Sequence, residues 1–382
     1  MNVVILGGDG YLGWPTAMHL SAHGHNVTVV DNYLRRNIAQ EEDSEPLRAL
    51  PNLYERARLW KEASGKEIEV RIGDLCDWDF IASVFSNGNF GAVVHYAEQP
   101  SAPYSMIRRS AASMTLHNNI TATANTIFAV REFCPDAHII KLGTMGEYGT
   151  PNIDIEEGWL DVEHNGRKQK FLYPRQAGSL YHTTKVMDTD LLWYYVRMWD
   201  LRVTDLMQGP VYGMLTDENE GMPELYPHFA YDELFGTVLN RFIVQAVAGY
   251  PLTVYGKGGQ TRGYLNLKDT LQCIRLSIEN PADKGELRIF NQFVETFSVN
   301  DLADKVSKIG NTMGLNVEVK SIENPRKEME EHYYNPAHTG LLDLGLKPNL
   351  LTDDVMANMI EEVVLHKQNI HKNRIFRGVK WA

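Results

Sequence analysis

The most constraining feature of this chain is a glycine-rich turn close to its first residue. Residues 3–6 form a short apolar run with the β-branched bias of a strand, and residues 11–23 carry apolar side chains at helical spacing. Gly7, Gly10 and Gly13 stand between the two. Glycines also serve ordinary tight turns, but at a strand-to-helix turn their bare backbone lets a pyrophosphate approach the N-terminal dipole of the helix. The pattern therefore predicts a dinucleotide-binding turn in a parallel α/β sheet.

An acidic residue at the end of the next apolar run supports this prediction. Asp31 closes residues 27–30, at about the distance from the glycines where an acid meets the hydroxyls of an adenosine ribose. A carboxylate there repels a 2′-phosphate, which favours NAD over NADP. Arg35 and Arg36 weaken that preference, because guanidinium groups just past the acid can hold a phosphate or stack on adenine. We expect NAD as the cofactor.

A second motif supplies the chemistry of a hydride-transfer site. Tyr181 and Lys185 are four residues apart, so on a helix they share one face. An ammonium group beside the phenol would lower the pKa of Tyr181, and Thr144 could share a proton with the same oxygen. A tyrosine and a lysine one turn apart are more often a surface pair, so this prediction depends on the glycine turn upstream. Together the two motifs predict Tyr181 as a general base for alcohol oxidation.

Strand and helix patterns alternate along the first half of the chain. The expected strands cover residues 69–72, 92–95, 138–142 and 202–206, and the expected helices cover residues 113–133 and 179–199. We predict a Rossmann-type doubly wound parallel sheet in residues 1–213 and a smaller mixed α/β substrate lobe in residues 214–382, with some elements of the lobe returning to the large domain. Functional side chains should then lie at the carboxyl ends of the strands.

Residues 151–178 interrupt the alternation. They contain Asn165 and Gly166 between two short runs, which is typical of a hairpin. The hairpin could be a lid over the site or an ordinary surface feature, and the sequence favours neither. The helix expected at residues 179–199 is apolar over most of its circumference. One side should pack on the sheet and another on a second subunit, so we expect a homodimer.

Composition limits the partners and the compartment. The 37 basic and 49 acidic residues give a net charge of −12, which argues against nucleic acid or an anionic membrane as a partner. No apolar run approaches the ~18 to 20 residues that span a bilayer, and the first strand leaves no room for a signal segment, so we expect a cytoplasmic protein. The three cysteines are widely spaced and predict neither disulfides nor a metal site.

Several strings give the chain a specific family resemblance. The glycine turn, Thr144, Tyr181, Lys185, Asn119 and residues 256–262 resemble an extended short-chain dehydrogenase/reductase of the nucleotide-sugar-modifying kind, across nearly the whole chain. Longer strings narrow the resemblance to a branch that uses sulfite, and they cover residues 98–106, 141–157, 254–264 and 330–334. The resemblance implies that UDP-glucose and sulfite are the substrates, that the product is a UDP-linked sulfonated sugar, and that tightly held NAD is recycled within each turnover.

The resemblance also implies binding roles for individual positions. The positions that match cofactor contacts are Gly7, Gly10, Tyr11, Leu12, Gly13, Asp31, Asn32, Arg35, Arg36, Asp74, Leu75 and Asn119, together with Tyr181 and Lys185. The positions that match contacts to the sugar are Gln99, Ser101 and Thr144, and those that match contacts to uridine and diphosphate are Gln208, Gln260, Arg262 and Arg326. Arginine suits a diphosphate because its planar fork binds two oxygens at once.

The implied reaction begins with oxidation of the sugar at C4. Tyr181, activated by Lys185 and hydrogen-bonded to Thr144, would take the proton of the C4 hydroxyl while NAD takes the hydride. The ketone acidifies the proton on C5, so water can leave across C5 and C6. Sulfite then adds at C6, and the hydride returns to C4.

The elimination of water needs a further proton carrier. Related 4,6-dehydratases have an acid and a base directly after the threonine, where this chain has Met145 and Gly146. Glu147 and His182 are the candidates. Each also has a structural alternative, since Glu147 could pair with an arginine and His182 could pack against the hairpin.

Two other functions stay open at this point. A UDP-hexose 4-epimerase or 4,6-dehydratase of the same fold is the first, and an epimerase would need only the threonine, the tyrosine and the lysine. The second is a dinucleotide-sensing regulator without chemistry, which the intact Tyr181 and Lys185 argue against.

Overall fold

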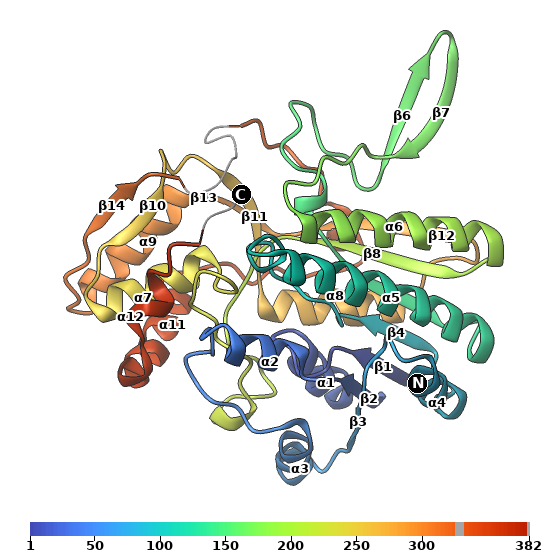
Figure 1. The fold of residues 1–382 in the computed structure, drawn as a ribbon, viewed down its shortest axis with the longest axis horizontal. Helices are drawn as coiled ribbons and strands as arrows, with labels where there is room; N and C mark the ends of the chain where they lie inside the picture. The colour runs from blue at the N-terminus through green and yellow to red at the C-terminus, as the bar shows by residue number, and fades with distance from the viewer. Residues whose placement is uncertain (325–331, 380–382) are drawn as a thin grey trace.

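The computed structural model describes residues 1–324 and 332–379 and is built around a seven-stranded sheet (Figure 1). The strands, in spatial order, are β12 (Glu286–Gln292), β8 (Arg202–Gln208), β5 (His138–Thr144), β4 (Ala92–His95), β1 (Asn2–Leu6), β2 (Asn26–Asp31) and β3 (Ile68–Ile72). Every neighbouring pair is parallel. The predicted doubly wound sheet is confirmed. Its order reverses between β1 and β4, which places a crevice at the carboxyl ends of these two strands.

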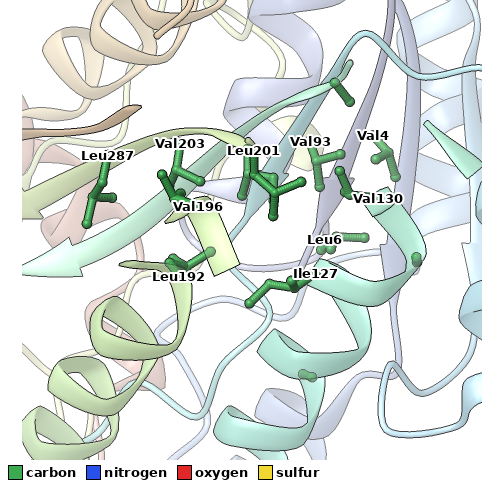
Figure 2. Packing of buried hydrophobic residues seen from close by; sticks show 14 of the residues in the cluster. Val4, Leu6, Val93, Ile127, Val130, Leu192, Val196, Leu201, Val203 and Leu287 are labelled. Carbon is green, nitrogen blue, oxygen red and sulfur yellow. The ribbon is translucent and has the colours of Figure 1, made fainter. Parts of the chain in front are cut away.

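Helices cover both faces of the sheet. One face carries α4 (Trp78–Gly88), α5 (Arg109–Phe133) and α6 (Leu180–Trp199), and the other carries α1 (Gly13–Ala22), α3 (Leu53–Ser64) and α8 (Leu267–Glu279). On the first face, Val93 and Val203 of the sheet pack against Ile127 of α5 and Val196 of α6 (Figure 2). Burial on both faces explains the nearly continuous apolar runs in the strand sequences. In the part of the chain described, no helix has the length and apolar character needed to cross a bilayer.

The second half of the chain forms a smaller lobe with its own core. Its helices are α7 (Val238–Ala248), α9 (Val299–Thr312) and α11 (Asp353–Leu365), and its strands are β9 (Val211–Tyr212), β10 (Leu252–Tyr255), β11 (Thr261–Asn266), β13 (Glu295–Ser298) and β14 (Val319–Ile322). The shorter helices α2 (Leu34–Glu41), α10 (Gly340–Asp343) and α12 (Lys372–Ile375) complete the fold. Strand β12 and helix α8 come from this half of the sequence but belong to the large sheet and its cover.

The hairpin predicted from Asn165 and Gly166 consists of β6 (Trp159–His164) and β7 (Arg167–Leu172), which pair antiparallel. Both turn residues have positive φ, 51° and 73°, as a tight two-residue hairpin turn requires. The hairpin extends away from the body of the protein (Figure 1). Its base is anchored where the ring of Trp159 packs edge-on against Trp193 of α6. In this structure it is a surface arm and does not cover the site described below.

Candidate active site

A cavity of about 490 Å³ lies at the carboxyl edge of the sheet. One end is lined by the glycine turn and Asp31, and the other by Tyr181 and His182. A segment of residues 228–240 supplies much of the opposite wall. The volume is in the range of pockets that hold cofactors and small ligands, and the position is the one expected for a doubly wound sheet.

Each of the three glycines of the turn is needed for a different structural reason. Gly7 has a φ of 88°, and a Cβ atom there would lie 2.8 Å from the Ala97 nitrogen. A Cβ atom on Gly13 would lie 2.0 Å from the Gly7 oxygen, so the first turn of α1 can pack against β1 only without a side chain. At Gly10 the nearest atom would be 3.4 Å away, so its backbone is open to the cavity. These contacts leave a bare helix N-terminus facing the cavity, which suits a pyrophosphate.

Asp31 is fixed at the end of β2 by two backbone donors. Its Oδ2 accepts a hydrogen bond from the nitrogen of Asp9, and its Oδ1 accepts one from the nitrogen of Tyr33. Burial and the nearby Asp9 carboxylate raise the pKa of Asp31 to about 6. The carboxylate lines the cavity and can accept ribose hydroxyls.

The two arginines after Asp31 have separate roles. Arg36 donates from Nε and Nη2 to the carboxylate of Asp9, at 2.6 and 2.7 Å. Although burial opposes it, hydrogen bonds from His228 and Arg36 lower the pKa of Asp9 to about 2. Arg35 lines the cavity and lies over the ring of Phe235, with its guanidinium carbon 3.3 Å from the ring centroid. Because Asp9 already neutralises Arg36, that side chain is engaged within the protein, and the preference for NAD over NADP is strengthened.

The other positions that match cofactor contacts divide into two groups. Those that line the cavity are Tyr11, Leu12, Asn32, Asp74 and Leu75. Asn119 does not line it, although it is fully buried nearby. Its Oδ1 accepts a hydrogen bond from the nitrogen of Gln99, and its Nδ2 donates to the hydroxyl of Thr184. Asn119 therefore joins α5, α6 and the segment after β4, and it shapes the cavity wall from behind.

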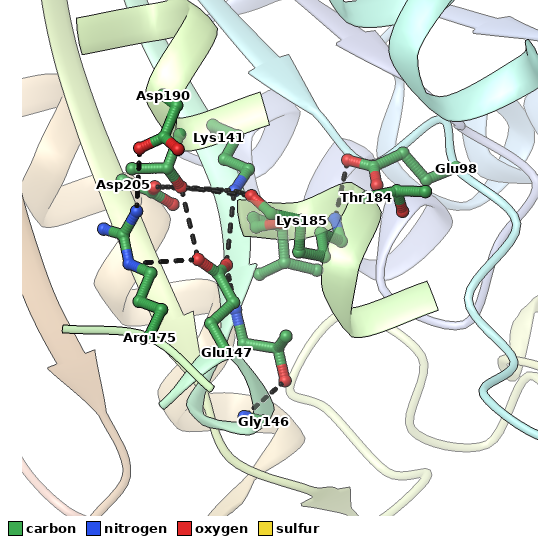
Figure 3. Close-up of polar contacts among 12 residues, drawn as sticks. Glu98, Lys141, Gly146, Glu147, Arg175, Thr184, Lys185, Asp190 and Asp205 are labelled. Carbon is green, nitrogen blue, oxygen red and sulfur yellow. Dashed lines mark hydrogen bonds and ion pairs between the residues drawn. The ribbon is translucent and has the colours of Figure 1, made fainter. Parts of the chain in front are cut away.

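Lys185 makes an ion pair that the sequence did not predict (Figure 3). Its Nζ lies 2.6 Å from Oε1 of Glu98 and also donates to the carbonyl oxygen of Leu142, at 2.5 Å. Both charged side chains are only 2% exposed. The same Nζ is 5.9 Å from the centroid of the Tyr181 ring, so the lysine and the tyrosine do share one face of α6.

The expected lowering of the Tyr181 pKa is wrong for this structure. Burial raises the pKa of Tyr181, and the Glu98 carboxylate raises it further. The physical reason is that Glu98 neutralises the lysine that was expected to favour the phenolate. In the described residues, no hydrogen bond joins the Tyr181 phenol to Thr144. The Thr144 hydroxyl instead accepts a hydrogen bond from the nitrogen of Gly146.

Glu147 lies behind Thr144 in a fully buried network of charges (Figure 3). Its carboxylate accepts a hydrogen bond from the nitrogen of Thr144 and closes the capping box of the short helix η2 (Met145–Glu147). It also lies 3.4 Å from Nζ of Lys141 and 3.5 Å from Nε of Arg175. Asp205 is the second carboxylate on Lys141, at 3.4 Å. Glu147 is not among the residues that line the cavity, and its arginine partner matches the structural alternative for this residue.

His182 lines the cavity beside Tyr181, with the two ring centroids 5.2 Å apart. A Cβ atom on Gly146 would lie 2.5 Å from Nε2 of His182, so the glycine makes room for this ring. The turn after Thr144 therefore contacts the ring that follows the tyrosine. Of the two candidate proton carriers, His182 is the one that faces the cavity.

The positions that match substrate contacts are spread over the structure. Ser101, Gln99 and Gln208 line the cavity, and the Gln208 amide donates to Gln292, at 3.1 Å. Gln260 donates to the Tyr255 carbonyl and does not line the cavity. Arg262 also lies outside the cavity lining, at 2.9 Å from a ring nitrogen of His332, and Arg326 lies outside the described residues.

Three charged residues of this region were given no role from the sequence, namely Asp9, Glu98 and Lys141, although Glu98 lies at the carboxyl end of a predicted strand, where functional side chains are expected. Asp9 stands inside the glycine turn and Glu98 follows β4 by three residues, so their positions at strand ends were a usable signal. Lys141 is in the middle of a buried strand, where only its charge among apolar neighbours distinguishes it.

Comparison with known proteins shows the family of this chain. The NAD dependent epimerase/dehydratase family model matches residues 3–291. The whole chain is 50% identical over 380 residues to the chloroplastic UDP-sulfoquinovose synthase of Spinacia oleracea and covers 79% of it. It is also 45% identical over 384 residues to the UDP-sulfoquinovose synthase of Sulfolobus acidocaldarius and covers 98% of that protein.

A solved structure with a similar fold is the UDP-glucose 4-epimerase of Bifidobacterium longum in complex with NAD+ and UDP. The TM-score is 0.72 at 18% identity, and the match covers 97% of this chain and all of the epimerase chain. At this identity the likeness supports the fold.

Proposed function

Because this chain belongs to the NAD dependent epimerase/dehydratase family, we propose that it converts UDP-glucose and sulfite to UDP-sulfoquinovose and water. The observation that carries the proposal is its full-length similarity to two UDP-sulfoquinovose synthases. The cavity adds independent support, because a dinucleotide turn and an active-site tyrosine line the same space.

The chain uses NAD, and the residues at the glycine turn fit it. NAD, when bound, accepts a hydride from a sugar carbon and can give it back. The open backbone at Gly10 and the N-terminus of α1 would hold the pyrophosphate, and Asp31 would accept hydroxyls of the adenosine ribose. The stacked Arg35 and Phe235 would bound the adenine end.

Tyr181 removes the proton of the C4 hydroxyl in the first step and returns one to C4 oxygen in the last. Its phenol faces the cavity, and Lys185 is held on the same side of α6. A phenol of raised pKa stays protonated at neutral pH, so it holds a proton for the last step, and ligand binding must bring it closer to the ammonium group before it can accept a proton in the first step. Thr144, at the end of β5, would join that hydrogen-bond network once a sugar is present.

His182 is the proton carrier that we assign to the loss of water. The C4 ketone acidifies the C5 proton, and departure of the C6 hydroxyl as water then leaves an enone. Sulfite adds to C6 of this enone through sulfur and forms the C–S bond, and a proton returns to C5. His182 lines the cavity and can pass the proton taken from C5 to the departing C6 hydroxyl, and it can then deliver to C5 a proton supplied by bisulfite or solvent. Glu147, by contrast, is held by Lys141 and Arg175 behind the wall.

Recognition of the UDP-sugar is assigned to two sets of residues. Gln99 and Ser101, which line the cavity, and Thr144 would contact the sugar half. Gln208, Gln260 and Arg262 would contact the uridine and diphosphate, with a guanidinium fork that matches a diphosphate, and Arg326, outside the described residues, is the other position that matches these contacts. Binding would then have to bring the two sets onto one ligand.

The test is incubation of the purified protein with UDP-glucose, with and without sulfite, followed by mass analysis of the nucleotide sugar. The proposal requires a sulfonated UDP-sugar that appears only with sulfite. UDP-galactose alone would indicate a 4-epimerase, a UDP-4-keto-6-deoxy sugar a 4,6-dehydratase, and unchanged UDP-glucose a protein without this chemistry.

We also propose that the protein acts as a homodimer. Helices α5 and α6 expose apolar side chains on the surface opposite the sheet, namely Leu116, Phe128, Met187, Tyr194 and Met198. A second copy would cover this face. Met198→Asp should produce a monomer in sedimentation or light scattering, whereas Tyr54→Asp, which changes an equally exposed residue on α3, should leave the mass unchanged.

A further inference from the structure

Glu98 is a buried carboxylate at the catalytic end of the cavity, and the mechanism above does not use it. It follows β4 by three residues, and its backbone nitrogen donates to the Tyr96 carbonyl in a tight turn. Its side chain is 2% exposed and is among those that line the cavity. Oε1 of Glu98 forms an ion pair with Nζ of Lys185, at 2.6 Å.

Most of the hydrogen-bonding capacity of this carboxylate is unused. Apart from the contact between Lys185 and Oε1, no described residue donates a hydrogen bond to either oxygen of Glu98, and both atoms are buried. An ionised carboxylate has about four acceptor positions. Burial works to raise the pKa of Glu98, but Lys185 lowers it below its ordinary value, so the group is charged. A buried charge with open acceptor positions at a cavity wall is costly unless a ligand supplies donors.

We propose that Glu98 accepts a hydrogen bond from a ligand hydroxyl on one oxygen while its other oxygen holds Lys185 in place. This inference rests on the proposed function, because that function supplies two sources of hydroxyls in the same cavity. One is the ribose of the cofactor, and the other is the hexose of the substrate. Glu98 is therefore a binding residue toward the ligand and a positioning residue toward Lys185.

The second role has a consequence for proton transfer. The charged groups that act on the Tyr181 phenol are Glu98, Glu147 and Asp188, which raise its pKa, and Lys141, which lowers it. Lys185 is the group expected to activate the phenol, and Glu98 both fixes its position and cancels part of its field. Removal of the Glu98 charge should therefore make Tyr181 a stronger acid.

The experiment compares Glu98→Gln and Glu98→Ala with the wild-type protein in two binding arms. The first arm measures NAD affinity by calorimetry without sugar, and the second measures UDP-glucose affinity in the NAD-loaded protein. Loss of a hydrogen bond to a charged group should weaken binding by about tenfold to a hundredfold in Glu98→Ala. A loss confined to the first arm identifies the ribose, and a loss confined to the second identifies the hexose.

A third measurement separates positioning from packing. The rate of NADH formation on mixing with UDP-glucose, without sulfite, is followed against pH. Because Tyr181 must be deprotonated for this step, the acid limb of the rate should move to lower pH in Glu98→Gln, by about one unit. A change of shape alone would not move that limb.

Glu163→Gln is the matched control, since it removes an exposed carboxylate of the hairpin arm that pairs with Lys168. It should leave both affinities and the pH profile unchanged. The inference is overturned if both affinities of Glu98→Ala stay within about threefold of wild-type, or if the acid limb of Glu98→Gln does not move. These readouts need no sulfonated product, so they are separate from the test of the overall reaction.

Discussion

Lys141 offers the sharpest test of how the site is supported. Its Nζ lies 3.4 Å from both Glu147 and Asp205, and it donates to the Thr189 hydroxyl and to the Lys185 carbonyl. The lysine and the two carboxylates have no exposed surface. Replacement by methionine keeps the length of the side chain and removes the charge. It leaves two buried carboxylates near each other, with Arg175 at 3.5 Å from Glu147 as a remaining ion-pair partner.

Removing one partner of a buried ion pair costs about 3–5 kcal/mol. With ~2.1 cal/mol/K of unfolding entropy per residue, a chain of 382 residues has an unfolding entropy of about 0.8 kcal/mol/K, so Tm should fall by about 4–6 °C. The loss should be largest at neutral and high pH. Burial already raises the pKa of Glu147, and a carboxyl whose pKa is raised in the folded state destabilises above that pKa and ceases to do so when it is protonated.

The assay is thermal unfolding of Lys141→Met between pH 5 and pH 8, with Lys168→Met as the control. Lys168 pairs with Glu163 on the hairpin, where the two side chains are 80% and 58% exposed, so its loss should cost less than ~1 kcal/mol. Asp205→Asn added to Lys141→Met should restore part of the stability, because one of the two uncompensated charges is removed. If Lys141→Met is as stable as Lys168→Met at pH 8, the account of this network is wrong.

Three further outcomes follow from the site. Tyr181→Phe should lower turnover by about 10²- to 10⁴-fold while NAD stays bound, as measured by product formation and by cofactor absorbance of the purified protein. Gly13→Ala should weaken NAD binding and cost ~1–3 kcal/mol in denaturant unfolding, since its Cβ atom would lie 2.0 Å from the Gly7 oxygen. NAD affinity should fall as pH drops below about 6, because protonated Asp31 accepts hydrogen bonds from the ribose hydroxyls less well than the carboxylate does. Calorimetry should show that Asp31→Asn removes this pH dependence.

Much of the fold could be predicted from the sequence, because each central strand is buried on both faces and reads as an apolar run. Residues 92–95 and 138–142 were recognised in this way, and β4 (Ala92–His95) and β5 (His138–Thr144) are the strands found there. The turn at Asn165 was equally readable, since positive φ at two consecutive positions has a strong residue signature. Its direction away from the cavity was not, because local turn chemistry does not fix where a hairpin points.

The part of the site that sequence motifs define, at the ends of the parallel strands, could be predicted. The glycine turn, Asp31 and Tyr181 meet at one cavity because parallel strands bring their carboxyl ends together. The charge balance around Lys185 was not predictable from the spacing of the motif. Glu98 is distant in sequence, and only the packing of β4 beside β5 and α6 brings its carboxylate to the lysine.

The central claim is that the sugar is oxidised and reduced at C4 by the same bound cofactor within one turnover. UDP-glucose carrying deuterium at C4 tests it directly, with purified protein, sulfite and no added NADH. The account predicts a sulfonated UDP-sugar that retains the deuterium at C4. A sulfonated product without the deuterium, or full activity in Tyr181→Phe, would contradict it.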